Sequence, residues 1–401
     1  MKFGHLADCH LDAWREQKLK ALSLQAFEQA VSTCIREQTD FVLICGDLFN
    51  TALPNIDVLK FTVSQLERLK QASIPVYIIP GSHDVTHTGK SMIDVLEEAR
   101  LVKNVFRGHV EEQRLRLHFT HDKKTGVKLT GMLGRRGMLE KNYYEHLDAD
   151  ALEREQGEKL FLFHTALDEL KSAGMSHSIS SPLSFLPKNF LYYAGGHVHE
   201  VIQHSFPHYQ HIVYPGPLFP NSFSELEQLE HGGFFIYSNG TIIRKDLPLK
   251  KVLSITVSAE HSTPAQVTAA IKDALTDVHD AIITLRVEGC LASGKTADVP
   301  FNEIMQQTLN QGAYAFLKNT AAFTSEQFEE FKKEYHSAEE LESAFLHEHA
   351  GQVKTGMTPE EEIALAKKLM SILSVPREDG EKVYSYEDRM RKQGKTTLGL
   401  E

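Results

Sequence analysis

Five short apolar runs recur in the first half of the chain, and each has the length and composition of a buried β-strand. They are Phe3 to Ala7, Phe41 to Cys45, Val76 to Ile79, Leu160 to Phe163 and Leu191 to Ala194. Stretches with apolar residues at helical spacing separate the first three, and the clearest are Leu22 to Glu37 and Asn55 to Gln71. Strands that alternate with helices indicate βαβ units and a largely parallel sheet. The first hundred residues therefore predict an α/β fold.

The helix predicted over residues 55–71 carries apolar side chains on two sides. The side predicted to face the sheet is formed by Ile56, Leu59, Val63 and Leu66. Val58 and Phe61 lie toward another side, where they would either widen the stripe that faces the core or contact a second copy of the chain. The pattern leaves both interpretations open.

The pattern of elements changes twice along the rest of the chain. From about Leu115 the segments shorten and predict more antiparallel pairing, which includes a hairpin at the turn Ser238-Asn239-Gly240. From Lys250 a β-α-β-α-β pattern without a ligand cluster predicts a small capping domain, and after Ser325 the chain becomes charged and helical. We therefore predict a first domain over residues 1–248, a capping domain over 249–322 and a helical segment with a tail over 323–401.

Three helices are predicted in this last segment, over residues 326–335, over 338–349 and from Thr358, which the pattern Thr-Pro-Glu-Glu marks as a helix start with a capping box. A linker over 351–356 precedes the third helix. The apolar stripe of the third helix can fold back on its own chain or dock on a partner, and the pattern favours neither. Its members are Ile363, Ala366, Met370 and Leu373. Residues from Gln393 onward are predicted to form a loose tail.

Side chains that bind metals follow directly after each of the five strand-like runs. They are Asp8 and His10, Asp47, the segment Ser82-His83-Asp84, His164, and the pair His197 and His199. Ligands collect beyond the carboxyl ends of strands in an α/β sheet, so we expect these groups to share one crevice. A single Asp or His at a strand end is more often a helix cap or a turn residue, but the ordered recurrence indicates a metal site. Aspartate oxygen and histidine nitrogen suit Mn, Fe or Zn, and such a site predicts hydrolytic chemistry.

Composition bounds the class of protein. The 401 residues suffice for two to three domains, and 41% hydrophobic with 24% charged residues is ordinary for a globular protein. No apolar run reaches the ~18 residues of a membrane span, and the chain begins with a strand rather than with a secretory signal, so we expect a cytoplasmic protein. The four cysteines show no metal-binding spacing and predict no disulfide framework.

The net charge of the chain limits how it could bind a nucleic acid. A formal net charge of −11 argues against a protein that grips nucleic acid by overall charge, because non-specific affinity comes from cations that neutralise phosphates. Three local basic pairs remain, Lys123-Lys124, Arg135-Arg136 and Lys250-Lys251. Such a pair is usually a solvated surface feature, and only its position relative to the metal crevice would make it a phosphate contact.

The order of these motifs resembles the calcineurin-like metallophosphoesterases. The motifs that carry the resemblance are Asp8/His10, Gly46-Asp47, Gly81-Ser82-His83-Asp84, His164 and Gly196-His197-Val198-His199. Within that superfamily the chain is similar to the SbcD-type DNA double-strand-break repair exonucleases, through His5 to Leu11, Gly46 to Phe49 and Tyr214-Pro215-Gly216. Weaker similarity to the second domain of that family is found at Arg286 to Gly289 and Asp298 to Phe301. The resemblance implies an αββα sandwich with a small α/β capping domain and a helical carboxy-terminal segment.

The resemblance also implies a role for each residue of the candidate site. Two Mn²⁺ ions are expected, with Fe or Zn as possible substitutes, and Asp47 would bridge them. Asp8, His10 and His199 would complete one metal site, and Ser82, His164 and His197 the other. His83 would remain unligated and act on the transition state or the leaving oxygen, and Asp84 would orient it through the other ring nitrogen.

By resemblance the chain is a DNA nuclease of double-strand-break repair, with 3′-5′ exonuclease and single-strand endonuclease activity. The implied partners are DNA, an SMC-like coiled-coil ATPase held by the carboxy-terminal helices, and a second copy of the chain, with no membrane. Two alternatives remain: a phosphodiesterase or phosphatase that acts on small nucleotides or phosphoproteins, and a weakly active subunit that tethers DNA ends. Protein phosphatases of the superfamily carry Asp-Arg-Gly after the bridging aspartate, whereas this chain has Leu48-Phe49-Asn50, which counts against a phosphatase.

Three residues depart from the family pattern. Ser82 stands where the family normally has Asn. The Ser side chain is shorter, and its hydroxyl is a weaker metal ligand than an amide oxygen, so we expect a loosely held second metal. Asn50 replaces a common His and cannot become a cation. Pro217 replaces a Ser.

Overall fold

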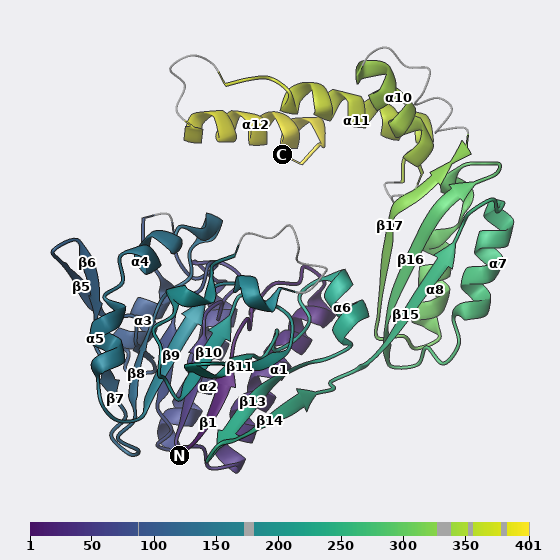
Figure 1. Ribbon diagram of the computed structural model, residues 1–401. Coiled ribbons are helices and arrows are strands. Elements are labelled where there is room, and N and C mark those ends of the chain that lie inside the picture. The colour runs from purple at the N-terminus through teal and green to yellow at the C-terminus, as the bar shows by residue number, and fades with distance from the viewer. Residues whose placement is uncertain (87, 172–179, 327–337, 352–355, 378–382, 401) are drawn as a thin grey trace. The chain divides into compact units, whose positions relative to one another are not determined.

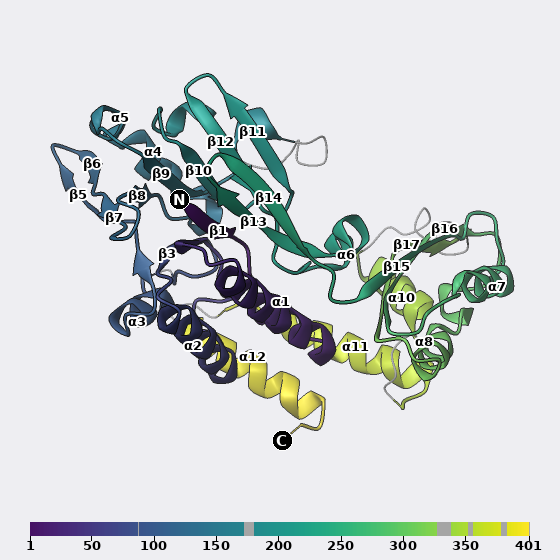
Figure 2. The same ribbon diagram turned by 90° about the horizontal axis from the view of Figure 1, so that it is seen from below.

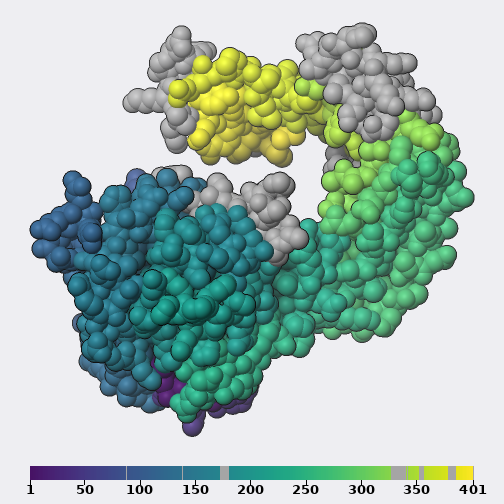
Figure 3. Space-filling model, viewed as in Figure 1, coloured from purple at the N-terminus to yellow at the C-terminus, as the bar shows by residue number. Residues whose placement is uncertain are grey.

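The computed structural model describes residues 1–86, 88–171, 180–326, 338–351, 356–377 and 383–400. Within them the chain divides into two compact units, Met1–Lys251 and Val252–Glu401. Figure 1 traces the elements of each unit, and Figure 3 draws the atoms of the chain in a space-filling view with the same colours. Each unit is described by itself.

The first unit contains two six-stranded sheets, and the first of them has the strand order β14-β13-β1-β2-β3-β4. Its strands are β1 (Lys2–Leu6), β2 (Phe41–Cys45), β3 (Val76–Ile79), β4 (Lys103–Asn104), β13 (Gly232–Ser238) and β14 (Thr241–Leu247). β1 to β4 pair in parallel, as the βαβ pattern predicted. β13 and β14 form the predicted hairpin, in which both turn residues, Asn239 and Gly240, have positive φ.

The second sheet has the order β11-β12-β10-β9-β8-β7. Its strands are β7 (Thr120–His121), β8 (Lys128–Gly131), β9 (Lys159–His164), β10 (Tyr192–Gly196), β11 (Ile202–Phe206) and β12 (Tyr209–Tyr214). The expectation of mainly antiparallel pairing is wrong here, because β8, β9, β10 and β12 pair in parallel and only the edges are antiparallel. Crossover segments bring these strands back in the same direction, and short strands alone do not reveal that.

Helices cover the outer faces of both sheets, so the layers are helix, sheet, sheet and helix. Figure 2 shows α1 (Gln17–Arg36) and α2 (Ile56–Gln71) side by side beneath the first sheet. The other helices of this unit are α3 (Met92–Glu98), α4 (Lys141–Glu145), α5 (Ala149–Arg154) and α6 (Phe223–Leu229), and a separate hairpin consists of β5 (Gly108–Glu111) and β6 (Arg114–Leu117). This architecture is the predicted αββα sandwich.

Alternation along β9 shows how the strands fill two cores at once. Leu160 and Leu162 lie in the core between the sheets, whereas Phe161 and Phe163 lie in a second core that also contains Tyr144 of α4. Successive side chains of a strand point to opposite faces, so a strand covered on both faces is apolar throughout. The continuous apolar runs of the sequence are therefore the central strands.

The apolar face predicted for α2 is confirmed at Leu66, which is buried, but is wrong at Ile56 and Val63. Ile56 is 80% exposed and Val63 is also exposed, whereas Val58 is 1% exposed. The buried stripe is Val58, Thr62, Gln65, Leu66 and Leu69. It has helical spacing too, and its polar members are satisfied locally, since the Thr62 hydroxyl donates to the Val58 carbonyl at 2.8 Å. Thr62 and Gln65 interrupt the apolar pattern of this stripe, so its helical spacing could not be recognised from the sequence.

The second unit contains a three-stranded sheet in the order β15-β16-β17. Its elements are β15 (Lys251–Ser258), α7 (Pro264–Ala274), β16 (Ala281–Leu291), α8 (Phe301–Asn310), β17 (Ala315–Ser325), α10 (Ala338–His349), α11 (Pro359–Leu373) and α12 (Val383–Thr397). Thr358 caps α11 with the predicted capping box. The loose tail predicted from Gln393 is wrong as far as Thr397, because α12 continues to that residue.

Some predictions for the second unit are not tested by these elements. The helix predicted over 326–335 lies outside the described residues except for Glu326, and so does most of the linker over 351–356. The division into a capping domain and a helical segment stays a prediction. All four cysteines are free thiols. In the part of the chain that the structure describes, every helix is too short or too polar to cross a membrane.

A buried histidine joins the two sheets of the first unit. His5 of β1 is fully buried, its Nδ1 lies 3.0 Å from the Tyr192 hydroxyl, and its Nε2 lies 3.1 Å from the Gly195 carbonyl oxygen. Because a carbonyl only accepts, Nε2–H donates to Gly195 and Nδ1 accepts from Tyr192. Burial lowers the pKa of His5 to about 3 although the Gly195 carbonyl opposes this, so the imidazole is neutral.

This histidine predicts a specific loss of stability in acid. The pKa of about 3 in the folded chain lies below the ordinary value of 6.5, so the unfolded chain binds the proton first as the pH falls. The contribution of His5 is complete above pH 6.5 and decreases toward pH 3. In His5→Gln, the fall in the free energy of unfolding between pH 6.5 and 5 should be smaller by about 2 kcal/mol. Fluorescence of Trp14, the single tryptophan, reports unfolding of this unit. Equal losses in both proteins would contradict the prediction.

Candidate metal centre

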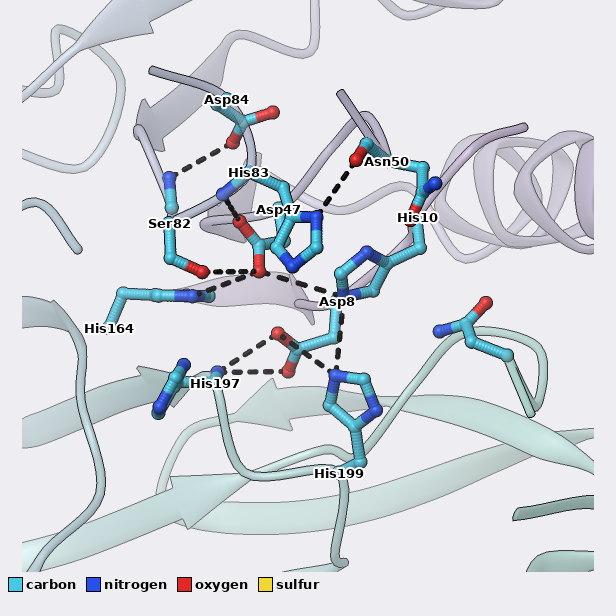
Figure 4. Close-up of polar contacts among 12 residues, drawn as sticks. Asp8, His10, Asp47, Asn50, Ser82, His83, Asp84, His164, His197 and His199 are labelled. Atoms are coloured by element: carbon cyan, nitrogen blue, oxygen red, sulfur yellow. Dashed lines mark hydrogen bonds and ion pairs between the residues drawn. The ribbon is translucent and has the colours of Figure 1, made fainter. Parts of the chain in front are cut away.

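The side chains predicted as metal ligands come together at the carboxyl ends of strands from both sheets. Asp8 and His10 follow β1, Asp47 follows β2, and Ser82 follows β3. From the second sheet, His164 is the last residue of β9, and His197 and His199 follow β10. Figure 4 shows these groups around one crevice.

The backbone is strained where it presents these groups. Positive φ angles, which favour glycine, occur at Asp8 (48°), His10 (40°), Asp47 (52°) and His197 (86°). Residues of this kind persist only where the surrounding structure holds them, and they gather at functional sites. Four such residues in one crevice point to a site that is built for function rather than for stability.

The Asp47 carboxylate occupies the middle of the crevice. Its Oδ2 lies 3.2 Å from His164 Nε2 and 3.6 Å from His10 Nε2. The Ser82 hydroxyl donates to the same oxygen at 3.3 Å, and the His83 backbone N–H donates to Oδ1 at 2.7 Å. Asp47 therefore faces groups of the first sheet on one side and groups of the second sheet on the other.

The Asp8 carboxylate marks the second part of the crevice. It accepts the His197 backbone N–H at 2.9 and 3.1 Å, and its Oδ1 lies 3.9 Å from His199 Nε2. His199 Nε2 is also 3.2 Å from His10 Nε2. Two imidazole nitrogens at this distance could both coordinate one metal ion.

Hydrogen bonds behind the crevice fix which ring nitrogens are offered. His164 Nδ1–H donates to the Cys45 carbonyl at 2.8 Å, and His199 Nδ1–H donates to Glu225 Oε1 at 3.0 Å. Each Nε2 is thereby left as a ligand atom, in the arrangement typical of metal-binding histidines. His164 Nε2 is buried and lies 3.2 Å from Asp47 Oδ2 without the geometry of a hydrogen bond. A divalent cation fits this donor set.

Three groups of side chains in the described residues could each hold an ion. They are Asp8 with His10 and His199, Asp47 with His10 and His83, and Asp47 with Asp8 and His164. Asp8, His10 and Asp47 each belong to two of these groups. The His197 imidazole belongs to none of them, although its ring lies beside that of His164 with the centroids 5.1 Å apart.

The expected contact between Asp84 and the His83 ring is wrong. His83 Nδ1–H donates to the Asn50 carbonyl at 2.8 Å instead. The Asp84 carboxylate accepts the backbone N–H groups of Leu48, Phe49 and Gly81 at 2.9 to 3.2 Å. The ends of β2 and β3 leave these amides without a partner, and a buried carboxylate satisfies them. Asp84 thus holds together the two loops that carry Asp47 and His83.

Electrostatics of the crevice favour a cation. Burial raises the pKa of Asp8 to about 6 and lowers the pKa of His10 to about 3. Burial also opposes the charge on His164, but the Asp47 carboxylate raises the pKa of that imidazole to about 10. The His164 proton balances the negative charge of Asp47, and a metal ion that binds here would displace it.

Glu225 and Glu140 are carboxylates that the motifs did not reveal. Glu225 of α6 orients His199. Glu140 is buried and accepts a hydrogen bond from the Thr165 hydroxyl at 3.3 Å, next to His164. Glu225 stands three residues after Ser222, which is the spacing of a helix start, and this local signal explains the residue without any site.

Comparison with known proteins places these features in context. The family model of the calcineurin-like phosphoesterases matches residues 1–201. The chain is 28% identical over 228 residues to the DNA double-strand break repair protein Mre11 of Archaeoglobus fulgidus, which covers 54% of this chain and 49% of that protein. It is 25% identical over 287 residues to the Mre11 protein of Saccharolobus solfataricus, with 69% and 70% covered. The chain thus spans about half the length of the first of these relatives.

Among solved structures, the chain is similar to a dimetal phosphatase from Danio rerio. The TM-score is 0.39 at 12% identity, with 61% of this chain and 95% of that chain covered.

Gly196 allows the two sheets to meet behind the crevice. A Cβ at this position would overlap the Cys45 carbonyl oxygen and lie 2.8 Å from His164 Nδ1. Gly196→Ala should therefore break the hydrogen bond that orients His164 and lower Mn²⁺ affinity by about 10–100-fold, the usual cost of losing such support. Calorimetric titration would measure this. Gly394→Ala, which has open space around the added methyl, is the control. Unchanged affinity in Gly196→Ala would contradict the prediction.

Proposed function

The chain belongs to the calcineurin-like phosphoesterases, and we propose that within this family it is a metal-dependent DNA nuclease of double-strand-break repair. The observation that carries the proposal is the position of Asp47, whose Oδ2 faces His164 and His10 from opposite sheets. The DNA substrate is supported by the two Mre11 relatives, which are named for repair of DNA double-strand breaks.

The proposed centre would hold two divalent ions, preferably Mn²⁺, with Asp47 as the shared ligand. Asp8, His10 and His199 would complete one site, and Ser82, His164 and His197 the other. Two bound ions would lower the pKa of a water molecule and stabilise negative charge on the phosphoryl oxygens. The fold positions these ligands. The backbone adopts positive φ angles at Asp8 and Asp47, and hydrogen bonds orient the rings of His164 and His199.

His83 is the proposed proton donor to the leaving oxygen. Its ring is half-buried and directed toward His10 and Asp47 in Figure 4, with ring centroids of His83 and His10 4.8 Å apart. Because Nδ1–H is used by the Asn50 carbonyl, Nε2 is the atom that can hold and release a proton. A positioned proton donor contributes typically ~10²–10⁴-fold to the rate. Asp84 acts as a positioning residue through the backbone amides that it accepts.

Ser82 makes the second metal site of this chain the weaker one in the proposal. Its hydroxyl donates a hydrogen bond to Asp47 at 3.3 Å. An amide at this position would offer a carbonyl oxygen, which is a better ligand for a hard divalent ion than a hydroxyl. The chain is therefore expected to need more Mn²⁺ for full activity than a relative with Asn.

Exposed apolar side chains support the proposed partners. Ile56 of α2 and Leu53 just before it are 80% and 74% exposed, which supports a contact with a second copy of the chain. In the second unit, Phe345 of α10 and Leu373 of α11 are 52% and 63% exposed, which supports docking of the carboxy-terminal helices on a coiled-coil ATPase.

A comparison of substrates tests the proposed function. Linear duplex DNA, bis(p-nitrophenyl) phosphate and p-nitrophenyl phosphate are incubated with the full chain and Mn²⁺, and the expected result is cleavage of the DNA and of the diester. Asp47→Ala should lose more than about a hundredfold on both, because changes behind the ligands alone cost ~10–100-fold. Asp150→Ala, an exposed carboxylate on α5, is the control.

Two results would count against the proposal. Cleavage of the small diester without cleavage of DNA would favour a phosphodiesterase that acts on small nucleotides. Residual activity of Asp47→Ala near that of the wild type would exclude a centre built on this carboxylate.

A further inference from the structure

The backbone that leads into one basic pair of the chain packs against the candidate metal centre. Arg135 and Arg136 directly follow Gly134, whose backbone packs on the His164 ring: a Cβ at Gly134 would overlap His164 Cδ2 and lie 2.9 Å from the His164 carbonyl oxygen. The Gly134 N–H donates to the Pro80 carbonyl at 2.9 Å, immediately before Gly81 and Ser82. The backbone that carries the two arginines therefore passes between the loop after β3 and the end of β9.

A buried carboxylate holds this loop against the centre. Glu140 Oε2 accepts the Arg135 backbone N–H at 3.0 Å, and Glu140 Oε1 accepts the hydroxyl of Thr165, the residue after His164, at 3.3 Å. The Arg135 guanidinium in turn donates to the Tyr143 hydroxyl at 3.1 Å. Hydrogen bonds thus fix Arg135 relative to His164, and Arg136 is its neighbour in the sequence.

The charges of both arginines remain available. Neither forms an ion pair among the described residues, and Arg136 is exposed. Some other cations of this unit are neutralised, as Arg107 is by Glu97 at 2.6 Å and Lys124 by Asp40 at 2.7 Å. In a chain of net charge −11, two adjacent arginines without an ion pair among the described residues are a local concentration of positive charge. Guanidinium groups offer several parallel N–H donors, which match phosphate oxygens.

We propose that Arg135 and Arg136 form a phosphate clamp, which binds backbone phosphates of a nucleic acid next to the phosphodiester at the metal centre. The inference rests on the proposed function and adds how the site prefers a polymer to a small ester. A mononucleotide or a small diester has no flanking phosphate, so it gains nothing from the clamp. A DNA strand gains two contacts that position it without reading its sequence.

The test uses the double variant Arg135→Ala/Arg136→Ala in the full chain. With a single-stranded oligonucleotide and Mn²⁺, KM should rise by about ten- to a hundredfold, the scale of losing two charge-assisted hydrogen-bonded contacts, while kcat changes little. Hydrolysis of bis(p-nitrophenyl) phosphate should stay at the wild-type rate. The slope of log KM against log salt should become shallower by about 1.4, because each contact to a single strand contributes about 0.7.

Two further variants separate a contact from a general charge effect. Lys103→Ala/Lys123→Ala removes the same charge from exposed residues that form no ion pair among those described, at the amino-terminal end of β3 rather than at its carboxyl end. Its salt slope and KM should match the wild type. Arg135→Lys/Arg136→Lys keeps the charge and should recover most of the affinity. Trp14 fluorescence during unfolding checks that all variants fold equally.

Three outcomes would overturn the clamp. In Arg135→Ala/Arg136→Ala, KM and the salt slope could stay unchanged, or activity on bis(p-nitrophenyl) phosphate could fall equally, which would mean that the arginines support the structure of the centre. The Lys103→Ala/Lys123→Ala control could also show the same change as the arginine variant. Oligonucleotide affinity, measured by fluorescence anisotropy without turnover, keeps the test separate from the nuclease proposal. If the wild type binds DNA but does not cleave it, only the nuclease proposal is contradicted. If the wild type does not bind DNA, the nuclease and the clamp proposals are both contradicted.

Discussion

The candidate centre depends on one close approach between the two sheets, where the end of β2 meets the ends of β9 and β10. The Cys45 carbonyl accepts the His164 Nδ1–H at 2.8 Å, and Gly196 leaves no side chain in the way. Asp47 stands two residues beyond Cys45, so this contact sets how far the Asp47 carboxylate lies from the histidines of the second sheet. His5 joins β1 to β10 through the Tyr192 hydroxyl and the Gly195 carbonyl.

Burial gives this arrangement its chemical character. Asp8, Asp47 and Asp84 are all at most 2% exposed, and buried carboxylates are tolerated only when hydrogen bonds or cations satisfy them. Asp84 is satisfied by three backbone amides, whereas Asp47 faces His164, whose Nε2 lies 3.2 Å from Asp47 Oδ2 without the geometry of a hydrogen bond. The two acids therefore have different tasks: Asp84 organises loops, and Asp47 presents negative charge to the crevice. The same division separates Glu140, which anchors the loop of Arg135, from the groups that would meet a metal ion.

Sequence patterns predicted the strands and most of the residues in the crevice because both follow from local rules. A strand covered on both faces is apolar throughout, and a functional residue at its carboxyl end follows within two or three positions. Contacts made at long range left no such signal. Asp84 was assigned to His83, its neighbour in sequence, but the unpaired amides of a neighbouring loop attract it in the fold. Glu225 resembled an ordinary helix start, and the buried face of α2 was concealed by Thr62 and Gln65. Whether the individual ligand assignments are correct stays a prediction.

In the proposed function, Asp47 would bring two metal ions together in one centre. Electron paramagnetic resonance of the chain loaded with Mn²⁺ tests it most directly, because two ions that share a carboxylate ~3.5–4 Å apart are spin-coupled, whereas separate ions are not. We expect that two Mn²⁺ bind per chain and give a coupled spectrum, and that Asp47→Asn gives only the spectrum of isolated ions. A single equivalent of Mn²⁺, or two equivalents without coupling in the wild type, would contradict it.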